Sequence, residues 1–417
     1  MKMNIYTRLL MLIGLLPTIS YGQAVNKGIF YIKPGSVVSV YYPLENKGEG
    51  VFENNGELYL HDNLINNGKI FDYKGNSPQG RTYLVGNKLQ LIEGATITNF
   101  NSLILNNPSK YKAFDIKAPL SIAGNVEFLD GIAKVDSVKG AFTFLNHSKV
   151  VHVGDHSHIE GEVEKEGNEE FTYPKGDKGY YRQASISAPL RTKDIYVGRY
   201  SLDDHKFFKI RPNAAGIVDK VNTKEYWVIE HSKSTSSNVI LTLSWDERTT
   251  PKEIYAKAKE NLHILRWDAK EQLWVDEGGI VDVENKTVTT PASLDSYGFF
   301  TLGTVKTDKM LKGDVVIYNL VSANGDGQND FFRIDNIERF PNNKVEIFNR
   351  WGVKVYETAN YDTHGNVFKG YSEGRITINK REQLPTGTYY YIVSYEYNDK
   401  SGSRMIKKTG YLHLETN

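Results

Sequence analysis

The segment Glu45–Phe71, ENKGEGVFENNGELYLHDNLINNGKIF, repeats a short polar turn followed by a pair of apolar residues in alternation. Turns at Gly48, Gly56 and Gly68 precede the apolar residues, which are Val51 and Phe52, then Leu58 and Leu60, then Ile70. Asn and Gly tolerate the positive φ angles of tight corners. The pattern therefore predicts short rungs, each of which buries one face on the next rung.

Similar rungs continue along the chain at residues 91–107, 119–135 and 140–163, where apolar and polar residues alternate between Gly and Asn turns. We predict that residues 23–160 form a parallel β-helix or solenoid-like domain. An ordinary β-sandwich is the alternative, because the spacing of the turns is irregular.

The composition indicates an all-β protein of two or three domains. The 417 residues exceed the size of a single core, and 27 Tyr, 18 Phe and 36 Gly suit short strands joined by tight turns. A net charge of +1 gives no electrostatic indication of binding to nucleic acid or to an anionic membrane. Cysteine is absent, which excludes disulfides and thiolate metal sites.

Residues 1–22 have the features of a signal peptide. Lys2 and Arg8 precede an apolar run from Leu9 to Ile19, and small residues follow it before Gln23. A retained membrane anchor is the alternative, but Gly14 and Pro17 interrupt the run, which is shorter than the ~20 residues of a membrane span. We therefore expect export through the inner membrane and an extracellular or cell-surface location.

A cluster of histidines falls within the predicted solenoid, at His147, His152, His156 and His158. On a strand His156 and His158 would lie on the same side, which is compatible with two imidazole ligands on one metal ion. We favour a polar, solvent-facing edge, because no carboxylate or thiolate is interleaved closely enough to complete the ligand set.

We predict a second, β-sandwich-like domain over residues 161–307. The acidic stretch Glu160–Glu170 is expected to be a solvated surface segment between the two domains. Strands are predicted at residues 194–200, 225–231, 238–245, 262–267, 272–277 and 297–305, with one short helix at residues 251–262. Four tryptophans lie in these strands and are assigned to an aromatic core in preference to a sugar-binding platform: Trp227, Trp245, Trp267 and Trp274.

A third domain is predicted over residues 308–417. At least five antiparallel strands in this length suggest a small Ig-like β-sandwich. In the segment Thr388–Tyr397, one face would carry Tyr389, Tyr391, Val393, Tyr395 and Tyr397.

The last ~100 residues, the size of one small domain, carry three ordered motifs: SANGDGQNDFFRIDNIERFPNNKVEIFNRWGVKVYE, then LPTGTYYYIV, then KKTGYLHL. Together they resemble the gliding-motility-associated C-terminal domain, also called the type B sorting domain of type IX secretion, of Bacteroidota. The resemblance implies recognition by the type IX secretion translocon and by a PorP/SprF-like outer-membrane protein. The motif positions to which it assigns this role are Asn349, Arg350, Trp351, Gly352, Lys369, Gly387, Tyr389, Gly410 and Tyr411.

The chain departs from this family at one element. The family usually has an Asn followed by Trp-Asp-Gly, whereas this chain has Phe368 and Lys369 in place of the Trp and the Asp. The anchoring aromatic is kept in kind, but a role that depends on the acidic group is in doubt.

The loop NGDGQND is a candidate calcium site. Asn324, Asp326, Asn329 and Asp330 offer oxygen ligands, and the intervening glycines would let the backbone curl around a hard cation. The full EF-hand spacing is absent, however. We favour an Asx turn, in which these side chains bond their own backbone amides and no cofactor is needed.

These observations predict a non-enzymatic cell-surface or secreted protein, exported by type IX secretion and associated with adhesion or gliding motility. The alternative is a glycan-binding or glycan-cleaving module with the same export signal. Neither a paired set of catalytic carboxylates nor a G-x-S-x-G element stands out. The stretch Ser201–His205 contains triad residue types, but adjacency in the sequence does not create triad geometry.

Overall fold

The computed structural model describes residues 22–73, 79–109, 112–291, 293–306, 315–318, 320–323, 329–362, 365–372, 383–399 and 402–416. Residues 1–21 of the predicted signal peptide lie outside this set. The described chain is all-β apart from a few short helical turns, as the composition predicts. No helix among these residues is long and apolar enough to cross a membrane.

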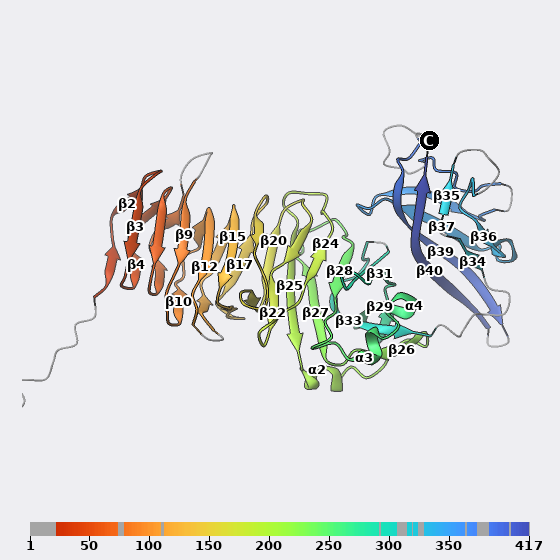
Figure 1. Cartoon of the computed structure of the whole chain (residues 1–417), viewed down its shortest axis with the longest axis horizontal. Coiled ribbons are helices and arrows are strands. Elements are labelled where there is room, and N and C mark those ends of the chain that lie inside the picture. Colours follow the sequence, from red (N-terminus) through yellow and green to blue (C-terminus); the bar gives the residue numbers. More distant parts are fainter. Residues whose placement is uncertain are drawn as a thin grey trace, which may run out of the picture.

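The N-terminal part is a β-solenoid of about six turns, in agreement with the sequence prediction. Figure 1 shows its turns stacked into an elongated rod from the red N-terminal end. The first parallel sheet contains β1 (Ala24–Asn26), β4 (Leu44–Lys47), β7 (Leu64–Asn67), β10 (Gln90–Glu93), β13 (Phe114–Lys117), β16 (Ala133–Val135), β19 (Ile159–Glu160) and β22 (Lys175–Asp177).

The strands on the other faces of the rod also pair in parallel. One sheet contains β3 (Val37–Val40), β6 (Glu57–Leu60), β9 (Arg81–Leu84), β12 (Ser102–Asn106), β15 (Asn125–Asp130) and β18 (Lys149–Val151). The remaining face begins with β2 (Ile29–Ile32), β5 (Val51–Asn54) and β8 (Ile70–Asp72), and it continues with β11 (Thr98–Phe100), β14 (Pro119–Ile122), β17 (Ala141–Phe144) and β20 (Val163–Glu166).

A ladder of asparagine side chains runs along the inside of one corner. Asn26 donates from Nδ2 to Oδ1 of Asn46 at 2.9 Å, and Asn46 donates in the same way to Asn66 at 3.1 Å. Asn66 then donates to Oγ1 of Thr98 at 3.0 Å. Because Asn46 and Asn66 are fully buried, these bonds satisfy amide groups that water cannot reach.

Aromatic rings stack inside the rod in the same manner. The centroid of Phe52 lies 5.0 Å from that of Phe30 and 4.7 Å from that of Phe71, with nearly parallel planes. These three rings fill the interior of the first three turns without a change of side-chain volume, and Phe100 meets Phe71 edge-on in the next turn. Of the apolar residues that follow the Gly turns in the sequence, Phe52, Leu58 and Leu60 build the core, whereas Ile70 is exposed and its neighbour Phe71 takes the inward position.

The irregular spacing of the turns in the sequence has a structural counterpart. Asn26, Asn46 and Asn66 follow one another at intervals of 20 residues, whereas 28 residues separate Asn63 from its neighbour Leu91 in the next turn. Gly68 follows the ladder residue Asn66 closely, and a Cβ atom at Gly68 would overlap the side chain of Asn46. A glycine is therefore required at this turn, because the side chain of Asn46 lies too close to leave room for a Cβ atom.

The solenoid passes directly into the middle region through one sheet. β20 pairs antiparallel with β25 (Ile195–Leu202), and the sheet continues through β27 (Glu225–His231), β33 (Gly298–Val305), β29 (Leu262–Asp268) and β30 (Leu273–Asp276), with β26 (Val218–Val221) beside β33. The prediction that Glu160–Glu170 is a solvated surface segment is wrong. β20 lies in mid-sheet with Val163 and Lys165 buried, because alternate residues of this stretch face the interior while the glutamates between them face out.

The second sheet of the middle region contains β21 (Phe171–Tyr173), β24 (Ala184–Ile186), β28 (Leu241–Ser244), β32 (Thr287–Thr289) and β31 (Ile280–Asp282), all antiparallel. β23 (Tyr180–Tyr181) pairs with β22. The short helices are α2 (His205–Lys209), α3 (Lys252–Tyr255) and α4 (Ala258–Asn261), and the last two replace the single helix predicted at residues 251–262. All four tryptophans predicted for the core are buried.

The C-terminal region contains a sheet in the order β35 (Leu320–Ser322), β40 (Gly402–Glu415), β39 (Gly387–Asp399), β37 (Asn343–Phe348) and β38 (Lys354–Ala359). β34 (Val316–Ile317) pairs with β36 (Ile334–Asp335), and a 3-10 turn, η1 (Ile337–Arg339), follows. The expectation of purely antiparallel strands is corrected at β35, which runs parallel to β40. These two strands lie at opposite ends of the region in sequence, so no short hairpin forces them to be antiparallel.

The buried apolar side chains form one large cluster through the solenoid and the middle region, a smaller one around Trp267 and Trp274, and a separate one in the C-terminal region. The predicted boundaries at residues 160 and 307, the sandwich-like middle region and the Ig-like C-terminal region stay predictions.

The ladder generates a first test. Asn46→Ala removes one rung and leaves the amide of Asn26 and the carbonyl of Asn66 without their partner, so we expect the free energy of unfolding to fall by about 1–3 kcal/mol. Urea denaturation measures the change. Asn125→Ala, at an exposed strand position, is the matched control and should be nearly neutral. Equal effects of the two substitutions would contradict the role of the ladder.

Lys175 is an unusual buried cation near the end of the solenoid. Its Nζ lies 4.3 Å from the ring centroid of Tyr173 and has no hydrogen-bond partner among the described residues. Burial lowers the pKa of Lys175 well below its ordinary value of 10.5, because the charged form loses its hydration. The folded state therefore binds this proton less readily than the unfolded state.

The sign of the pH effect follows from this difference. Between the lowered pKa of the folded state and 10.5, the unfolded state binds more protons, so the free energy of unfolding should rise with pH by up to about 1.4 kcal/mol per unit. Lys175→Met should remove this slope and stabilise the protein at pH 7. Urea denaturation at pH 7, 8 and 9 compares the variant with the wild type and with Lys149→Met, a change at an exposed lysine. The same slope in all three proteins would show that Lys175 stays protonated.

Candidate functional site

The hairpin of β39 and β40 forms the centre of the C-terminal region. The inward face of β39 carries Tyr389, Tyr391, Val393, Tyr395 and Tyr397, all buried as the alternation in the sequence predicts. Across the strands, Phe348 lies beside Tyr390, and Tyr390 lies beside Tyr411. The outward face thus presents a row of three aromatic side chains, of which only Tyr411 is among the predicted recognition residues.

The turn between β37 and β38 positions three of the predicted recognition residues. Oδ1 of Asn349 accepts hydrogen bonds from the backbone N–H groups of Trp351 and Val353, both at 3.0 Å, which fixes the turn. Gly352 has a φ of 74°, a conformation that suits glycine. Trp351 is 56% exposed, and the guanidinium carbon of Arg350 lies 4.2 Å from its ring centroid.

Charge distinguishes this turn from the strands beside it. Lys344 and Lys354 each pair with both Glu346 and Glu357, at 2.7–3.0 Å. Hydrogen bonds from these lysines lower the pKa of Glu357 to about 2. In contrast, neither Arg350 nor Lys369 has an acidic partner among the described residues. These two cations are therefore available to an acidic or aromatic partner.

The departure from the family pattern at Phe368 and Lys369 has a clear structural meaning. Phe368 is fully buried, its ring packs against Tyr356 at 5.2 Å, and its N–H donates to the hydroxyl of Tyr361 at 3.0 Å. Lys369 is exposed. The aromatic position therefore anchors the core, while the substituted acidic position faces solvent.

The motif glycines Gly387 and Gly410 have different surroundings. A Cβ atom at Gly410 would overlap the ring and hydroxyl of Tyr391, whereas a Cβ atom at Gly387 would have no atom within 4 Å. Gly410 is thus required for packing of the hairpin. Tyr389 is also structural, because it is buried and donates from its hydroxyl to the carbonyl of Pro385 at 2.9 Å.

The structure divides the predicted recognition residues into two groups. Arg350, Trp351, Lys369 and Tyr411 present exposed side chains, whereas Asn349, Tyr389 and Gly410 shape the scaffold. Gly352 lies against the middle region, since a Cβ atom there would be 3.0 Å from Ile240 and 3.2 Å from Ser293. Recognition by these residues stays a prediction.

The predicted calcium ligands are only partly described. Asn324 and Asp326 lie outside the described residues. Asn329 has a φ of 56°, and its carbonyl accepts a hydrogen bond from the N–H of Ser322 at 2.7 Å, which is turn geometry. The choice between a calcium site and an Asx turn that includes Asp330 stays open.

The histidine cluster does not converge on one point. Nδ1 of His147 contacts Glu169 at 2.8 Å, His156 bonds the carbonyl of Phe128, and His158 is buried against the carbonyl of Gly154. Among the described residues, no group of three metal-ligating side chains is close enough to hold an ion. The expectation of a solvent-facing edge holds for His147, whose side chain is exposed. It is wrong for His158, whose side chain is buried.

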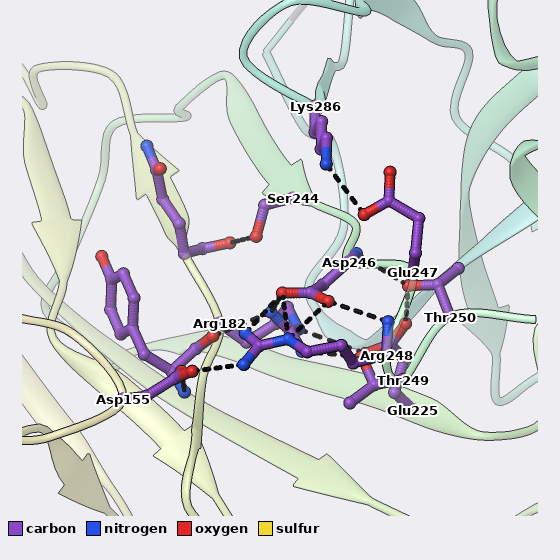
Figure 2. Close-up of polar contacts among 12 residues, drawn as sticks. Asp155, Arg182, Glu225, Ser244, Asp246, Glu247, Arg248, Thr249, Thr250 and Lys286 are labelled. Atoms are coloured by element: carbon purple, nitrogen blue, oxygen red, sulfur yellow. Dashed lines mark hydrogen bonds and ion pairs between the residues drawn. The ribbon is translucent and has the colours of Figure 1, made fainter.

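A dense charge network lies where the solenoid meets the middle region (Figure 2). Arg182 is buried and contacts Glu225 at 3.5 Å and Asp246 at 3.2 Å. Arg248 bridges Asp246 at 2.7 Å and Asp155 at 2.6 Å. No local pattern in the sequence indicates this group, because its members are up to 93 residues apart.

The carboxylates of this network are bonded by other side chains of the protein. Glu225 accepts hydrogen bonds from the hydroxyl groups of Tyr200 at 2.6 Å and Thr249 at 3.2 Å. Hydrogen bonds from Arg248 lower the pKa of Asp246 well below its ordinary value. Since these acids are held in ion pairs by the chain itself, the arrangement joins the last solenoid turn to the middle region.

Comparison with known proteins addresses the C-terminal region directly. Residues 315–414 match the family model described as the CHU_C Type IX secretion signal domain. The C-terminal region is a type IX secretion signal domain, and the chain is a type B sorting domain protein. The comparisons with curated proteins and with solved structures found no match.

This match confirms the resemblance seen in the sequence and gives the exposed turn a context. The signal domain spans β34 to β40, so the row of Phe348, Tyr390 and Tyr411 and the Arg350–Trp351 pair all lie within it. The signal domain implies export and interaction with the secretion machinery. Its exposed side chains are the candidates for that contact.

The different surroundings of the two motif glycines provide a test that separates packing from recognition. Gly410→Ala forces its new methyl group against Tyr391 and should destabilise the signal domain by about 1–3 kcal/mol, whereas Gly387→Ala should change stability little. Thermal denaturation of the full chain, followed by tyrosine circular dichroism, measures both. Arg350→Ala and Lys369→Ala should unfold like the wild type, because both side chains are exposed. A stable Gly410→Ala variant would contradict the packing role.

Proposed function

We propose that this protein is a non-enzymatic cell-surface or secreted protein, exported by the type IX secretion system and used in adhesion or gliding motility. The match of residues 315–414 to the signal domain carries the export part of this proposal. The solenoid supports the adhesion or gliding part of the proposal, because a stack of parallel turns is a stiff rod with long exposed faces. A rod of this kind suits contact at a distance from the cell.

The export route has two steps in this proposal. The N-terminal signal peptide brings the chain to the periplasm, and the signal domain then directs it through the outer membrane. The specific partner is a PorP/SprF-like outer-membrane protein, as the resemblance of the C-terminal motifs implies. The exposed side chains of Arg350, Trp351 and Lys369 would supply the contact, with an Ig-like sandwich as their scaffold.

Two features support a non-enzymatic role for the body of the protein. The buried carboxylate Glu225 is bonded by Arg182, Tyr200 and Thr249, so it is occupied by structural partners. In Ser201–His205, Asp204 caps α2 by accepting from the N–H of Phe207 at 3.1 Å, and Asp203 contacts Lys224 at 3.4 Å. These contacts give the three acids structural tasks, which supports the proposal.

Glycan binding is the second candidate function, and one surface cavity favours it. A cavity of about 400 Å³ in the middle region is lined by Tyr255 and by the edge of the buried Trp245, with Glu247 and Lys286 at 2.8 Å from each other beside them. Sugars bind to sites that combine aromatic rings with neighbouring polar or charged side chains. Binding of polysaccharides by the purified protein, lost in Tyr255→Ala, would support this candidate.

Deletion of the signal domain tests the main proposal. A chain that ends at Lys306 should fold and accumulate in the periplasm, because the solenoid and the middle region share a core that is separate from that of the signal domain. Protease treatment of intact cells should then digest the wild type and spare the truncated protein.

Fusion of residues 307–417 to a periplasmic passenger is the complementary experiment, and it should bring the passenger to the surface only in cells with an intact type IX system. The Arg350→Ala and Lys369→Ala variants of the full chain should fold normally and be displayed less. Normal surface display of the truncated chain would place the export signal elsewhere.

A further inference from the structure

Among the described residues, nothing covers the N-terminal end of the solenoid. Phe30 occupies the same inward position as Phe52 and Phe71, yet it is 41% exposed while they are 2% exposed. Phe30 stacks on Phe52 with one face of its ring, and no described residue stacks on the other face. Among the described residues, the interior of the first turn is therefore uncovered, and Figure 1 shows this turn at the end of the stack.

The strands at this end are unprotected edges. β1, β2 and β3 are each the last strand of their sheet, so their outer N–H and C=O groups have no strand partner among the described residues. None of their residues is charged or a proline, the usual devices that keep an edge from pairing. Ile29 and Val37 are 82% and 65% exposed, and Tyr41 and Tyr42 are exposed beside them.

The other end of the solenoid differs in this respect. β20 is covered by the antiparallel strand β25, and β22 is covered by β23. Arg248 and Asp155 then fasten the last turn to the middle region. The third sheet ends there at β18 without a further strand, so the N-terminal end is the one at which all three sheet edges of the described chain are uncovered.

We propose that this open end is an interface for a second copy of the chain, in a closed head-to-head dimer. A partner must offer three strand edges in the arrangement of β1, β2 and β3, together with apolar side chains inside them. The N-terminal end of a second copy has this shape. A head-to-tail contact would need an open end at β20 and β22, where β25 and β23 already lie.

The symmetry of this contact is consistent with strand pairing. A two-fold axis perpendicular to the rod reverses the direction in which the chain runs around it. Each edge strand then meets an antiparallel strand, which is the stronger pairing. One strand would pair with its own copy, and the other two would exchange partners. Phe30 of each copy would cover the open interior of the other.

The dimer has a consequence for the exported protein. The signal domain lies at the opposite end of the chain from the open turn (Figure 1), so the two signal domains would lie at the outer ends of a doubled rod. Neither signal domain would be covered by the interface. Dimer formation is therefore compatible with recognition of both copies.

Light scattering on the purified chain from Gln23 onward tests the proposal. The wild type should have twice the mass of the chain, and it should dissociate on dilution. The double variant Ile29→Lys/Val37→Lys should be monomeric, because it places charges at desolvated edges. Both side chains are exposed in the single chain, so the variant should keep the circular dichroism spectrum and the melting temperature of the monomeric wild type, measured after dissociation by dilution.

Val138→Lys is the matched control, since Val138 is 88% exposed and lies in the sixth turn, far from the open end. This variant should remain dimeric. A monomeric wild type, a dimer that survives Ile29→Lys/Val37→Lys, or growth into longer polymers would each overturn the proposal.

Spin labels give a second measurement, because the chain has no cysteine of its own. Glu49→Cys places a label at an exposed site of the second turn, and Val138→Cys places one in the sixth. In a head-to-head dimer the Glu49 labels should be closer together than the Val138 labels. The reverse order would overturn the proposed orientation.

Discussion

The stacking of equivalent side chains between successive turns is the constraint on which the rest of this structure depends. A turn of parallel strands cannot bury its own interior, so its asparagine amides and aromatic rings need the matching residues of the next turn. The bonds from Asn26 to Asn46 to Asn66 and the stack of Phe30, Phe52 and Phe71 meet this need. A loop can lengthen between turns, but the stacked positions must stay in register. This explains why the corners repeat in composition while their spacing varies.

A stack of this kind has unpaired strand edges and an uncovered interior at each end, unless other residues cover them. The two ends of this solenoid differ in this respect. At the C-terminal end, the antiparallel strand β25 covers β20, and the buried pair of Arg182 and Glu225 consolidates the junction. Removal of one member of such a pair leaves an uncompensated buried charge, so the junction is specific as well as tight. At the N-terminal end, β1, β2 and β3 have no strand on their outer side among the described residues. The asymmetry assigns different roles to the two ends, one for attachment to the middle region and one for assembly.

The signal domain is built on a different principle. Its core is separate from that of the solenoid and depends on the long hairpin of β39 and β40, where tyrosines alternate inward. The separate core distinguishes this part of the chain from the body. Of its motif residues, Gly410 and Tyr389 serve the hairpin, while Arg350 and Trp351 are exposed in the turn between β37 and β38. One motif therefore combines residues that build the scaffold with residues that are free to touch a partner.

The sequence by itself determined the all-β class, the solenoid, the buried tryptophans and the signal domain, because alternation, turn residues and motif order are local properties of the chain. It also placed Arg350, Trp351 and Lys369 in the candidate site. Only the tertiary structure decided that β20 belongs to mid-sheet, that β35 runs parallel to β40, and that Asp155, Arg182 and Arg248 meet at one junction. These facts depend on which distant strands pair, and the free energy of such pairing resides in contacts between segments that no local pattern relates. The open solenoid end is of the same kind, since an edge is defined by the absence of a neighbouring strand.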